Sequence, residues 1–236
     1  ASFDLSLVTD AGTNSVHRID PITNAYLGSF GGGILSNPRG IAINQSLQRA
    51  YILDATSRVS VWNYNTGEFV SSFNANLSGA SFLTANSDGT LNVAGSSTVR
   101  RYSVTGSTLA TYTRSGTLNV QQGILLQDGQ FYMSTRTGDS RALERFNYTT
   151  GAFIGSSSWL ADRMIPMSGS FDASPSANAL NAFAFLGSAV VELDVINNGP
   201  SSTVATSTQL IDTVVGVAEG HGSMSFVLGR DKTTPT

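Results

Sequence analysis

Short apolar stretches alternate with polar turns along the chain, and the alternation repeats at a regular spacing. Each unit contains two apolar residues three positions apart, and the second residues of successive pairs are separated by 43, 40, 44 and 47 positions. A polar turn and another short stretch follow each pair. Gly and Asn tolerate the positive φ of tight turns, so each unit contains a predicted β-hairpin. The pairs are Val16 and Ile19, Val59 and Trp62, Val99 and Tyr102, Leu143 and Phe146, and Val190 and Leu193.

Two more strands are predicted before each hairpin. One starts at a small residue and becomes apolar, and the other is a stiffer apolar run that occurs six times. No stretch keeps a period of 3.6 over the ten or more residues that a helix requires. The first kind comprises Gly40–Ile43, Ala80–Leu83, Gly123–Leu126, Gly169–Phe171 and Gly216–Ala218, and the second Leu5–Thr9, Tyr51–Leu53, Leu91–Val93, Phe131–Met133, Ala182–Leu186 and Met224–Leu228.

Four short antiparallel strands per unit are typical of a β-propeller blade. A β-sandwich also has many short strands, but it does not explain the same four-part pattern five times in succession. We therefore predict an all-β β-propeller of five four-stranded blades, and a six-bladed ring is the alternative. Pairing of the C-terminal strand Val214–Ala218 with the N-terminal strands would close the five-bladed ring, and Met224–Leu228 would then be surplus.

The predicted propeller is a single domain over residues 1–230. Its first blade combines residues 5–30 with 212–219, and residues 231–236 form a tail or the start of a linker. The other four blades cover 38–74, 79–114, 121–158 and 167–208.

Composition excludes several classes of protein. The chain has no Cys, so it forms no disulfide framework or thiolate metal site, and it has no apolar run of the roughly 18–20 residues that a membrane helix needs. Charged residues are 12% of the chain, the net charge is −3, and Lys232 is the only lysine. A protein that binds nucleic acid needs a basic surface, which this composition does not provide.

Part of the repeat resembles a known family of blades. The relevant stretches are Asn37–Ile43, which contains Pro-Arg-Gly-Ile-Ala, then Ala50–Asp54, and then Val59–Phe73 with its Asn-Thr-Gly turn. They resemble NHL-type or YVTN-type propeller repeats, and Leu7–Asp10 and Val16–Asp20 are similar. In later units Ala94, Ser134 and Gly187 replace the Asp that ends the second strand. The resemblance implies a ring-shaped scaffold, commonly extracellular or periplasmic in bacteria and archaea and often an interaction module.

Few residues are candidates for chemistry. His17 and His221 are the only histidines; we interpret His17 as a packing or surface residue, and His221 as the better candidate for a role. No second His or Gly-x-Ser-x-Gly motif completes a catalytic triad, so no catalytic residues are predicted.

Asp10 and Asp54 end equivalent strands and are weak candidates for metal ligands, with Asp172 as a third acid. The favoured alternative is that each carboxylate accepts hydrogen bonds from the turn that follows it. We therefore predict no metal and no cofactor.

Two segments are candidates for contact with a partner. Exposed aromatic, Met and Arg residues are enriched at interface centres, so the predicted connection between the fourth and fifth blades is the preferred patch. The surplus strand could add to the edge of another molecule's sheet. The patch comprises Trp159, Arg163, Met164 and Met167, and the assembly strand includes Met224, Phe226 and Leu228.

These observations favour a non-catalytic β-propeller that serves as a protein-interaction or self-assembly module. The alternatives are a carbohydrate-binding propeller, in which Trp159, Tyr26 or Tyr112 stacks on sugars, and a metal-dependent hydrolase or lyase.

A secreted or cell-surface location is expected, with the periplasm as the alternative, because the chain lacks Cys, has few lysines and opens at Ala1 rather than Met. Three sequons, at Asn44, Asn76 and Asn147, are candidate N-glycosylation sites.

Overall fold

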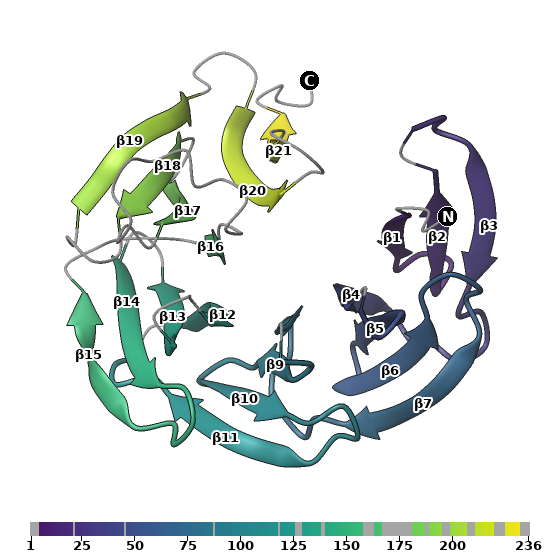
Figure 1. The fold of residues 1–236 in the computed structure, drawn as a ribbon, viewed down its shortest axis with the longest axis horizontal. Coiled ribbons are helices and arrows are strands. Elements are labelled where there is room, and N and C mark those ends of the chain that lie inside the picture. The colour runs from purple at the N-terminus through teal and green to yellow at the C-terminus, as the bar shows by residue number, and fades with distance from the viewer. Residues whose placement is uncertain are drawn as a thin grey trace. The chain divides into compact units, whose positions relative to one another are not determined.

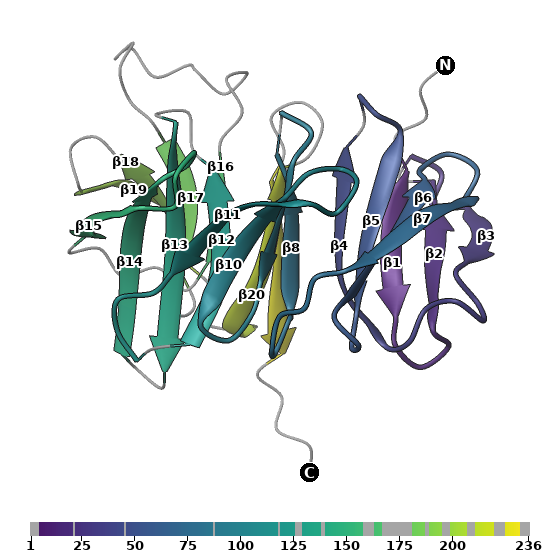
Figure 2. The same cartoon turned by 90° about the horizontal axis from the view of Figure 1, so that it is seen from below.

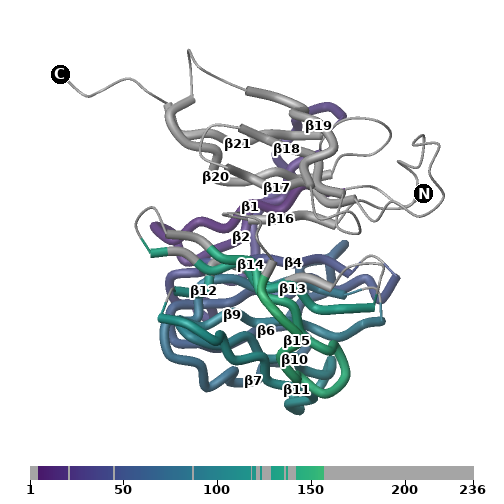
Figure 3. Tube along the Cα trace, turned by 90° about the vertical axis from the view of Figure 1, so that its left-hand side faces the viewer, coloured from purple at the N-terminus to yellow at the C-terminus, as the bar shows by residue number. Residues whose placement is uncertain are grey.

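The chain folds into antiparallel β-sheets, seen in a computed structural model (Figure 1). The structure describes residues 5–20, 22–44, 46–86, 88–117, 119–125, 129–137, 140–157, 163–166, 181–186, 189–194, 199–206, 211–219 and 225–231, and most of the side chains of these residues as far as residue 156. The trace can be followed in Figure 3. The chain divides into two compact units, Ala1–Tyr112 and Thr113–Thr236, and each is described by itself.

The described residues form 21 strands and no helix. The strands of each sheet are hydrogen-bonded in chain order, so successive strands run up and down (Figure 2). The first unit holds a three-stranded sheet of β1 (Ser6–Asp10), β2 (Ser15–Ile19) and β3 (Tyr26–Phe30), a four-stranded sheet of β4 (Pro38–Asn44), β5 (Arg49–Asp54), β6 (Arg58–Asn63) and β7 (Phe69–Asn74), and a four-stranded sheet of β8 (Phe82–Ala85), β9 (Leu91–Ala94), β10 (Thr98–Tyr102) and β11 (Thr108–Thr113), which ends at the boundary.

The second unit repeats the same topology. It contains two four-stranded sheets and one two-stranded sheet. These are β12 (Asn119–Leu125), β13 (Gln130–Thr137), β14 (Ser140–Asn147) and β15 (Phe153–Ser157); then β16 (Arg163–Pro166), β17 (Asn181–Leu186), β18 (Ala189–Asp194) and β19 (Gly199–Thr206); and last β20 (Ile211–Glu219) and β21 (Ser225–Asp231).

Nearly all the predicted strands occur, in the predicted order, and the exception lies in the fifth unit. The expected strand Gly169–Phe171 lies outside the described residues, and the strand that pairs with β17 is β16. Residues Arg163–Pro166 were expected to lie in a connection between blades, and this expectation was wrong. Their apolar pair Met164–Ile165 fits a strand, but they lack the initial small residue that marks the corresponding strand in the other units.

The strand expected to be surplus has a partner. β21 pairs antiparallel with β20 from Ile211 opposite Asp231 to Glu219 opposite Ser225. The expected closure of a ring would join strands from the two units, and closure and the number of blades stay predictions.

The core of the first unit lies between its sheets. β5 is buried on both faces, and its alternate residues enter different clusters. Ala50 and Ile52 pack with residues of the β1–β3 sheet, whereas Tyr51 and Leu53 pack with residues of the β8–β11 sheet. A strand that is covered on both faces has a continuous run of apolar residues in its sequence. This run explains why β5 could be predicted from the sequence.

The turn between the third and fourth strand of a sheet has a recurring structure. Asp20, Asn63 and Asn147 each precede such a turn, and the side-chain Oδ1 of each accepts backbone N–H groups from the residues two and three positions later at 2.8–3.1 Å. These Asx turns confirm the predicted hairpins.

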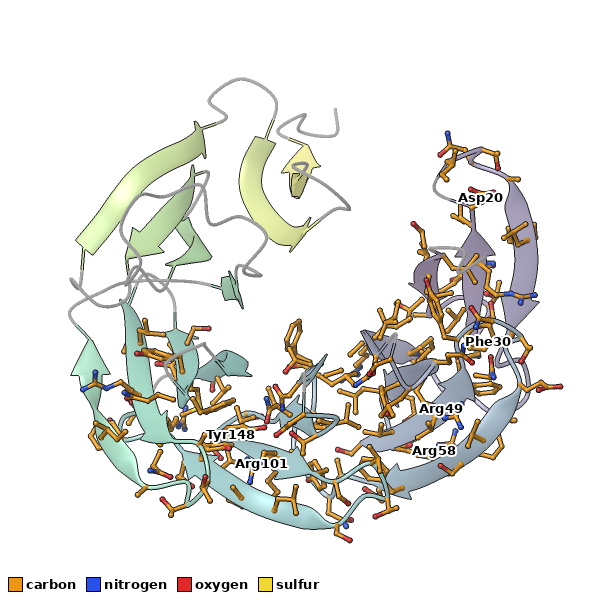
Figure 4. All side chains as sticks on the ribbon, in the orientation of Figure 1. Asp20, Phe30, Arg49, Arg58, Arg101 and Tyr148 are labelled. Atoms are coloured by element: carbon orange, nitrogen blue, oxygen red, sulfur yellow. The ribbon has the colours of Figure 1, made fainter. Side chains whose placement is uncertain are left out.

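In the β4–β7 sheet this turn also packs against the preceding sheet. Gly67 has φ of +74°, and a Cβ there would lie 3.0–3.1 Å from the Phe30 side chain. Phe30 ends β3, where that strand meets the neighbouring sheet (Figure 4), and its ring lies 5.1 Å from that of Trp62.

Candidate functional site

The strand-end aspartates hold their own turns, as the favoured interpretation predicts. Asp10 ends the edge strand β1, and its Oδ1 accepts the backbone N–H groups of Gly12 (2.8 Å) and Thr13 (3.3 Å). Its Oδ2 accepts the Thr13 hydroxyl at 2.6 Å. In the next sheet, Asp54 accepts the backbone N–H and the hydroxyl of Thr56 in the same way. Both carboxylates therefore stabilise the turn that follows their strand.

Asp10 also belongs to a polar network that crosses the β1–β3 sheet. Asp10 lies opposite Ser15 in the β1–β2 register, so it shares a face with His17. His17 Nε2 lies 3.1 Å from Asp10 Oδ2, and His17 Nδ1 lies 3.2 Å from the Tyr26 hydroxyl oxygen on β3. One carboxylate, one imidazole and one phenol thus form a continuous chain, which we call the Asp10–His17–Tyr26 relay.

Asp10 stays ionised in this arrangement. The hydrogen bond from the Thr13 hydroxyl, followed by those from His17 and from the backbone of Gly12 and Thr13, holds the pKa of Asp10 well below its usual range. The side chains of His17 and Asp10 are 29% and 34% exposed. Tyr26 is 62% exposed, so the phenol end of the relay lies at the surface.

The equivalent carboxylate in the next sheet is buried and has a different partner. The Asp54 side chain is fully buried, and its Oδ2 accepts Arg58 Nε at 3.2 Å and Nη2 at 3.0 Å. Arg58 Nη2 also donates to the carbonyl of Ile34, in the segment that joins β3 to β4. Asp54 is therefore part of the framework of the first unit.

Neither aspartate is placed to form a metal site with its neighbours. Within the described part of the chain, no three His, Cys, Asp or Glu side chains gather closely enough to hold a metal ion. His221 and Asp172 lie outside the described residues.

A second notable feature is the outermost strand of each sheet. β3, β7, β11 and β15 are edge strands, and in the first unit β3, β7 and β11 lie along the same outer side (Figure 1). The second residue of each is an aliphatic residue with 43–45% exposure. We call these four residues the outer-strand aliphatics: Leu27, Val70, Leu109 and Ile154.

In two of these strands, β7 and β15, the first residue is an aromatic residue with a different role. Phe69 packs edge-on against Trp62 with ring centroids 5.2 Å apart, and Phe153 packs on Phe146 at 5.6 Å. These rings fix the position of the strand. The aliphatic residues that follow these rings, Val70 and Ile154, are the extra residues of β-bulges, because the register passes from Phe69 to Ser71 and from Phe153 to Gly155.

The candidate partner residues are only partly described. Trp159, Met167 and Met224 lie outside the described residues. Arg163 and Met164 lie in β16, opposite Phe185 and Ala184, and Phe226 and Leu228 lie in β21, opposite Ala218 and Gly216. A role for these residues in binding a partner stays a prediction.

Two of the proposed sugar-stacking residues can be judged. Tyr112 is fully buried and cannot stack on a sugar, so this expectation was wrong. Tyr26 is exposed, and Trp159 lies outside the described residues.

The three sequons differ in accessibility. Asn44 is 7% exposed, and its Oδ1 accepts the Ser46 hydroxyl and the backbone N–H of Leu47, an arrangement that leaves little room for a glycan. Asn76 and Asn147 are exposed. Glycosylation of these two stays a prediction.

Comparison with protein-family models and with curated proteins finds no match. Among solved structures, the chain resembles hydrazine synthase from Kuenenia stuttgartiensis, with a TM-score of 0.59 and 14% identity over 81% of this chain. It spans 63% of that chain, less than two thirds of its length. A protein of unknown function from Bacteroides caccae is also similar, with a TM-score of 0.70 and 11% identity over 96% of this chain and 82% of the other.

These likenesses support an all-β, β-propeller-like fold. At such low identity they show the fold alone, because one fold carries many functions. They show no NHL-type or YVTN-type family, and the resemblance to those repeats stays a prediction. No helix in the described part of the chain is long and apolar enough to cross a membrane.

Proposed function

We propose that this chain is a non-catalytic, extracellular β-propeller module that binds proteins, including copies of itself, through the outer edges of its sheets. The observation that carries the proposal is the set of outer-strand aliphatics. Each lies on an edge strand, where unpaired backbone groups can accept another strand, and each adds an exposed aliphatic side chain.

The charge of the chain supports the same function. With 12% charged residues, the surface has few of the charges that normally protect edge strands from association. Natural edge strands commonly carry Lys, and this chain has one lysine, Lys232, which lies outside the described residues. Aliphatic side chains at the second position of four edge strands are therefore poorly protected by charge.

The test is the oligomeric state, measured by light scattering on size-exclusion fractions over a range of concentration. Wild type should form a regular oligomer or filament, visible in negative-stain images. The variant Leu27→Lys/Val70→Lys/Leu109→Lys/Ile154→Lys should be monomeric, because Lys at an edge opposes strand addition.

A matched control uses two aliphatic residues in turns. Leu47 and Val104 are 45% and 43% exposed, as much as the outer-strand aliphatics. The variant Leu47→Lys/Val104→Lys should keep the wild-type oligomeric state. A wild type that is monomeric at all concentrations, or a control that dissociates equally, would contradict the proposal.

The terminal strand β21 is a second candidate for self-association. Its residues Phe226 and Leu228 would join another molecule by strand addition. An unchanged oligomeric state after removal of residues 224–236 from a folded chain would contradict this part alone.

Glycans are a second class of partner, favoured by the exposed ring of Tyr26. Its hydroxyl is held by His17, so the ring is fixed in orientation and can stack on a sugar. A glycan array without hits would count against this alternative, and Tyr26→Ala should abolish any binding that the array reveals.

A further inference from the structure

The Asp10–His17–Tyr26 relay is not needed to build a sheet of this kind. The equivalent positions of two other sheets show this. His17 lies three residues before Asp20, which accepts hydrogen bonds from its turn. In the sheets whose turns begin at Asn63 and Asn147, the same position holds Ser60 and Glu144. The position of Tyr26 holds Phe69 and Phe153 there. Neither of those sheets places a phenol beside an imidazole, and both form the same hairpin.

The hydrogen bonds of the relay fix the direction of its protons. Asp10 is ionised and accepts at both oxygens, so His17 Nε2 must carry the hydrogen that points to Asp10. Neutral His17 then has its lone pair on Nδ1, and the Tyr26 hydroxyl donates to it across 3.2 Å. The phenol oxygen keeps its own lone pairs for the surface.

This geometry is that of a nucleophile, a base and a carboxylate that orients the base. We propose that Tyr26 is a modification site: a nucleophilic phenol, with His17 as its general base and Asp10 as the positioning residue, that accepts an acyl group from an activated acyl donor. The proposal is independent of the association of outer strands, because none of its three residues is an outer-strand aliphatic.

The chemical step balances within these groups and the donor. The Tyr26 oxygen forms a bond to the acyl carbon, while the phenol proton passes to His17 Nδ1. The bond between the acyl carbon and the leaving group of the donor then breaks, and the leaving group takes up the proton from His17. The products are O-acyl Tyr26, the protonated leaving group and neutral His17, so no oxidant or further reactant is required.

The experiment measures acetylation of Tyr26 by N-acetylimidazole, with the modified peptide followed by mass spectrometry over time. The key variant is His17→Gln, because Gln can hydrogen-bond to both neighbours but cannot take up the proton. We expect acetylation of Tyr26 to slow roughly tenfold or more, in line with the loss of a general base. In the Tyr26→Phe variant, this peptide should carry no acetyl group.

Two further variants separate chemistry from packing. Asp10→Asn should also slow the reaction, because His17 loses the carboxylate that orients it. Ser60→Ala changes the position equivalent to His17 in the next sheet, where Ser60 accepts Trp62 Nε1 at 2.8 Å, and it should leave the rate unchanged.

The proposal is overturned if Tyr26 is acetylated equally fast in wild type and His17→Gln, since exposure alone would then explain the reaction. It is also overturned if Ser60→Ala slows the reaction as much as His17→Gln does. An unchanged rate in Asp10→Asn overturns the positioning role of Asp10.

Discussion

The β1–β3 and β4–β7 sheets carry the same aspartate in two different environments. Asp10 and Asp54 both end the strand before a turn, and both accept hydrogen bonds from that turn. The Asp54 side chain is fully buried and paired with Arg58, whereas the Asp10 side chain is 34% exposed and reaches His17. In both sheets the aspartate stabilises the turn that follows it. Burial distinguishes the two partners of its Oδ2 atom, which are Arg58 for the buried Asp54 and His17 for the partly exposed Asp10.

The largest expected difference between the two sheets is the cost of losing this carboxylate. Asp54→Ala should lower the free energy of unfolding by about 3 kcal/mol, because it leaves Arg58 without its partner and the turn without its acceptor. Asp10→Ala should have a clearly smaller effect, since water can reach the groups that it releases. Urea unfolding of both variants, followed by circular dichroism, measures the difference, and equal losses would show that burial is not decisive.

The contact between the two sheets gives the second prediction. Gly67→Ala combines a positive φ with a Cβ 3.0–3.1 Å from the Phe30 side chain, so it should lower the free energy of unfolding by about 2 kcal/mol. Gly33→Ala has a similar φ of +79° but no atom within 4 Å, and it should cost about 1 kcal/mol. Thermal unfolding of the pair checks this, and an equal effect would mean that Phe30 moves aside freely.

The aromatic residues that begin the last strands of the two sheets, Tyr26 and Phe69, should differ less in their contribution to stability. Phe69→Ala removes an edge-on contact with Trp62, and the loss of the contact itself should cost about 1 kcal/mol. Tyr26→Ala should lower the free energy of unfolding less, because the Tyr26 ring is more exposed than that of Phe69 and packs on the partly exposed His17. A larger loss of unfolding free energy in Tyr26→Ala than in Phe69→Ala, measured by urea unfolding, would contradict this prediction.

The smallest expected effect is a pH dependence of stability, and it concerns only the β1–β3 sheet, where Asp10 is partly exposed. Hydrogen bonds lower the pKa of Asp10 from 3.8, so its ionised form favours the folded state above that pH. The stability difference between wild type and Asp10→Asn should therefore shrink as the pH falls below about 4. Urea midpoints over this range test the sign, and a difference that grows in acid would contradict it.

Most of the strands could be predicted from the sequence because their signal is local. The aromatic strands that begin at Tyr26, Phe69 and Phe153 follow turns whose residue types require that geometry. β16 was missed because the small residue that marks the first strand of the other units is absent there. Pairing between distant strands depends on long-range packing, which no local pattern encodes.

The relay was harder to predict than the strands that carry it. Asp10 and His17 were each noted, but as a turn residue and a packing residue. Their contact depends on the register of β1 and β2, in which Asp10 lies opposite Ser15 and Val8 opposite His17. Counting alternation outward from the turn places Asp10 and His17 on one face, so this signal was present. The hydrogen bond to Tyr26 also depends on the irregular register between β2 and β3, which no residue type reveals.

The double burial of β5 has a consequence for how the first unit unfolds. Its alternate side chains enter two clusters, so this strand cannot separate from one neighbouring sheet without disturbing the residues that hold the other. Such nearest-neighbour coupling makes stacked repeats melt as a cooperative block rather than one sheet at a time. Backbone amides of β5 should exchange with deuterium near the rate of global unfolding, while those of the edge strand β1 exchange through local opening.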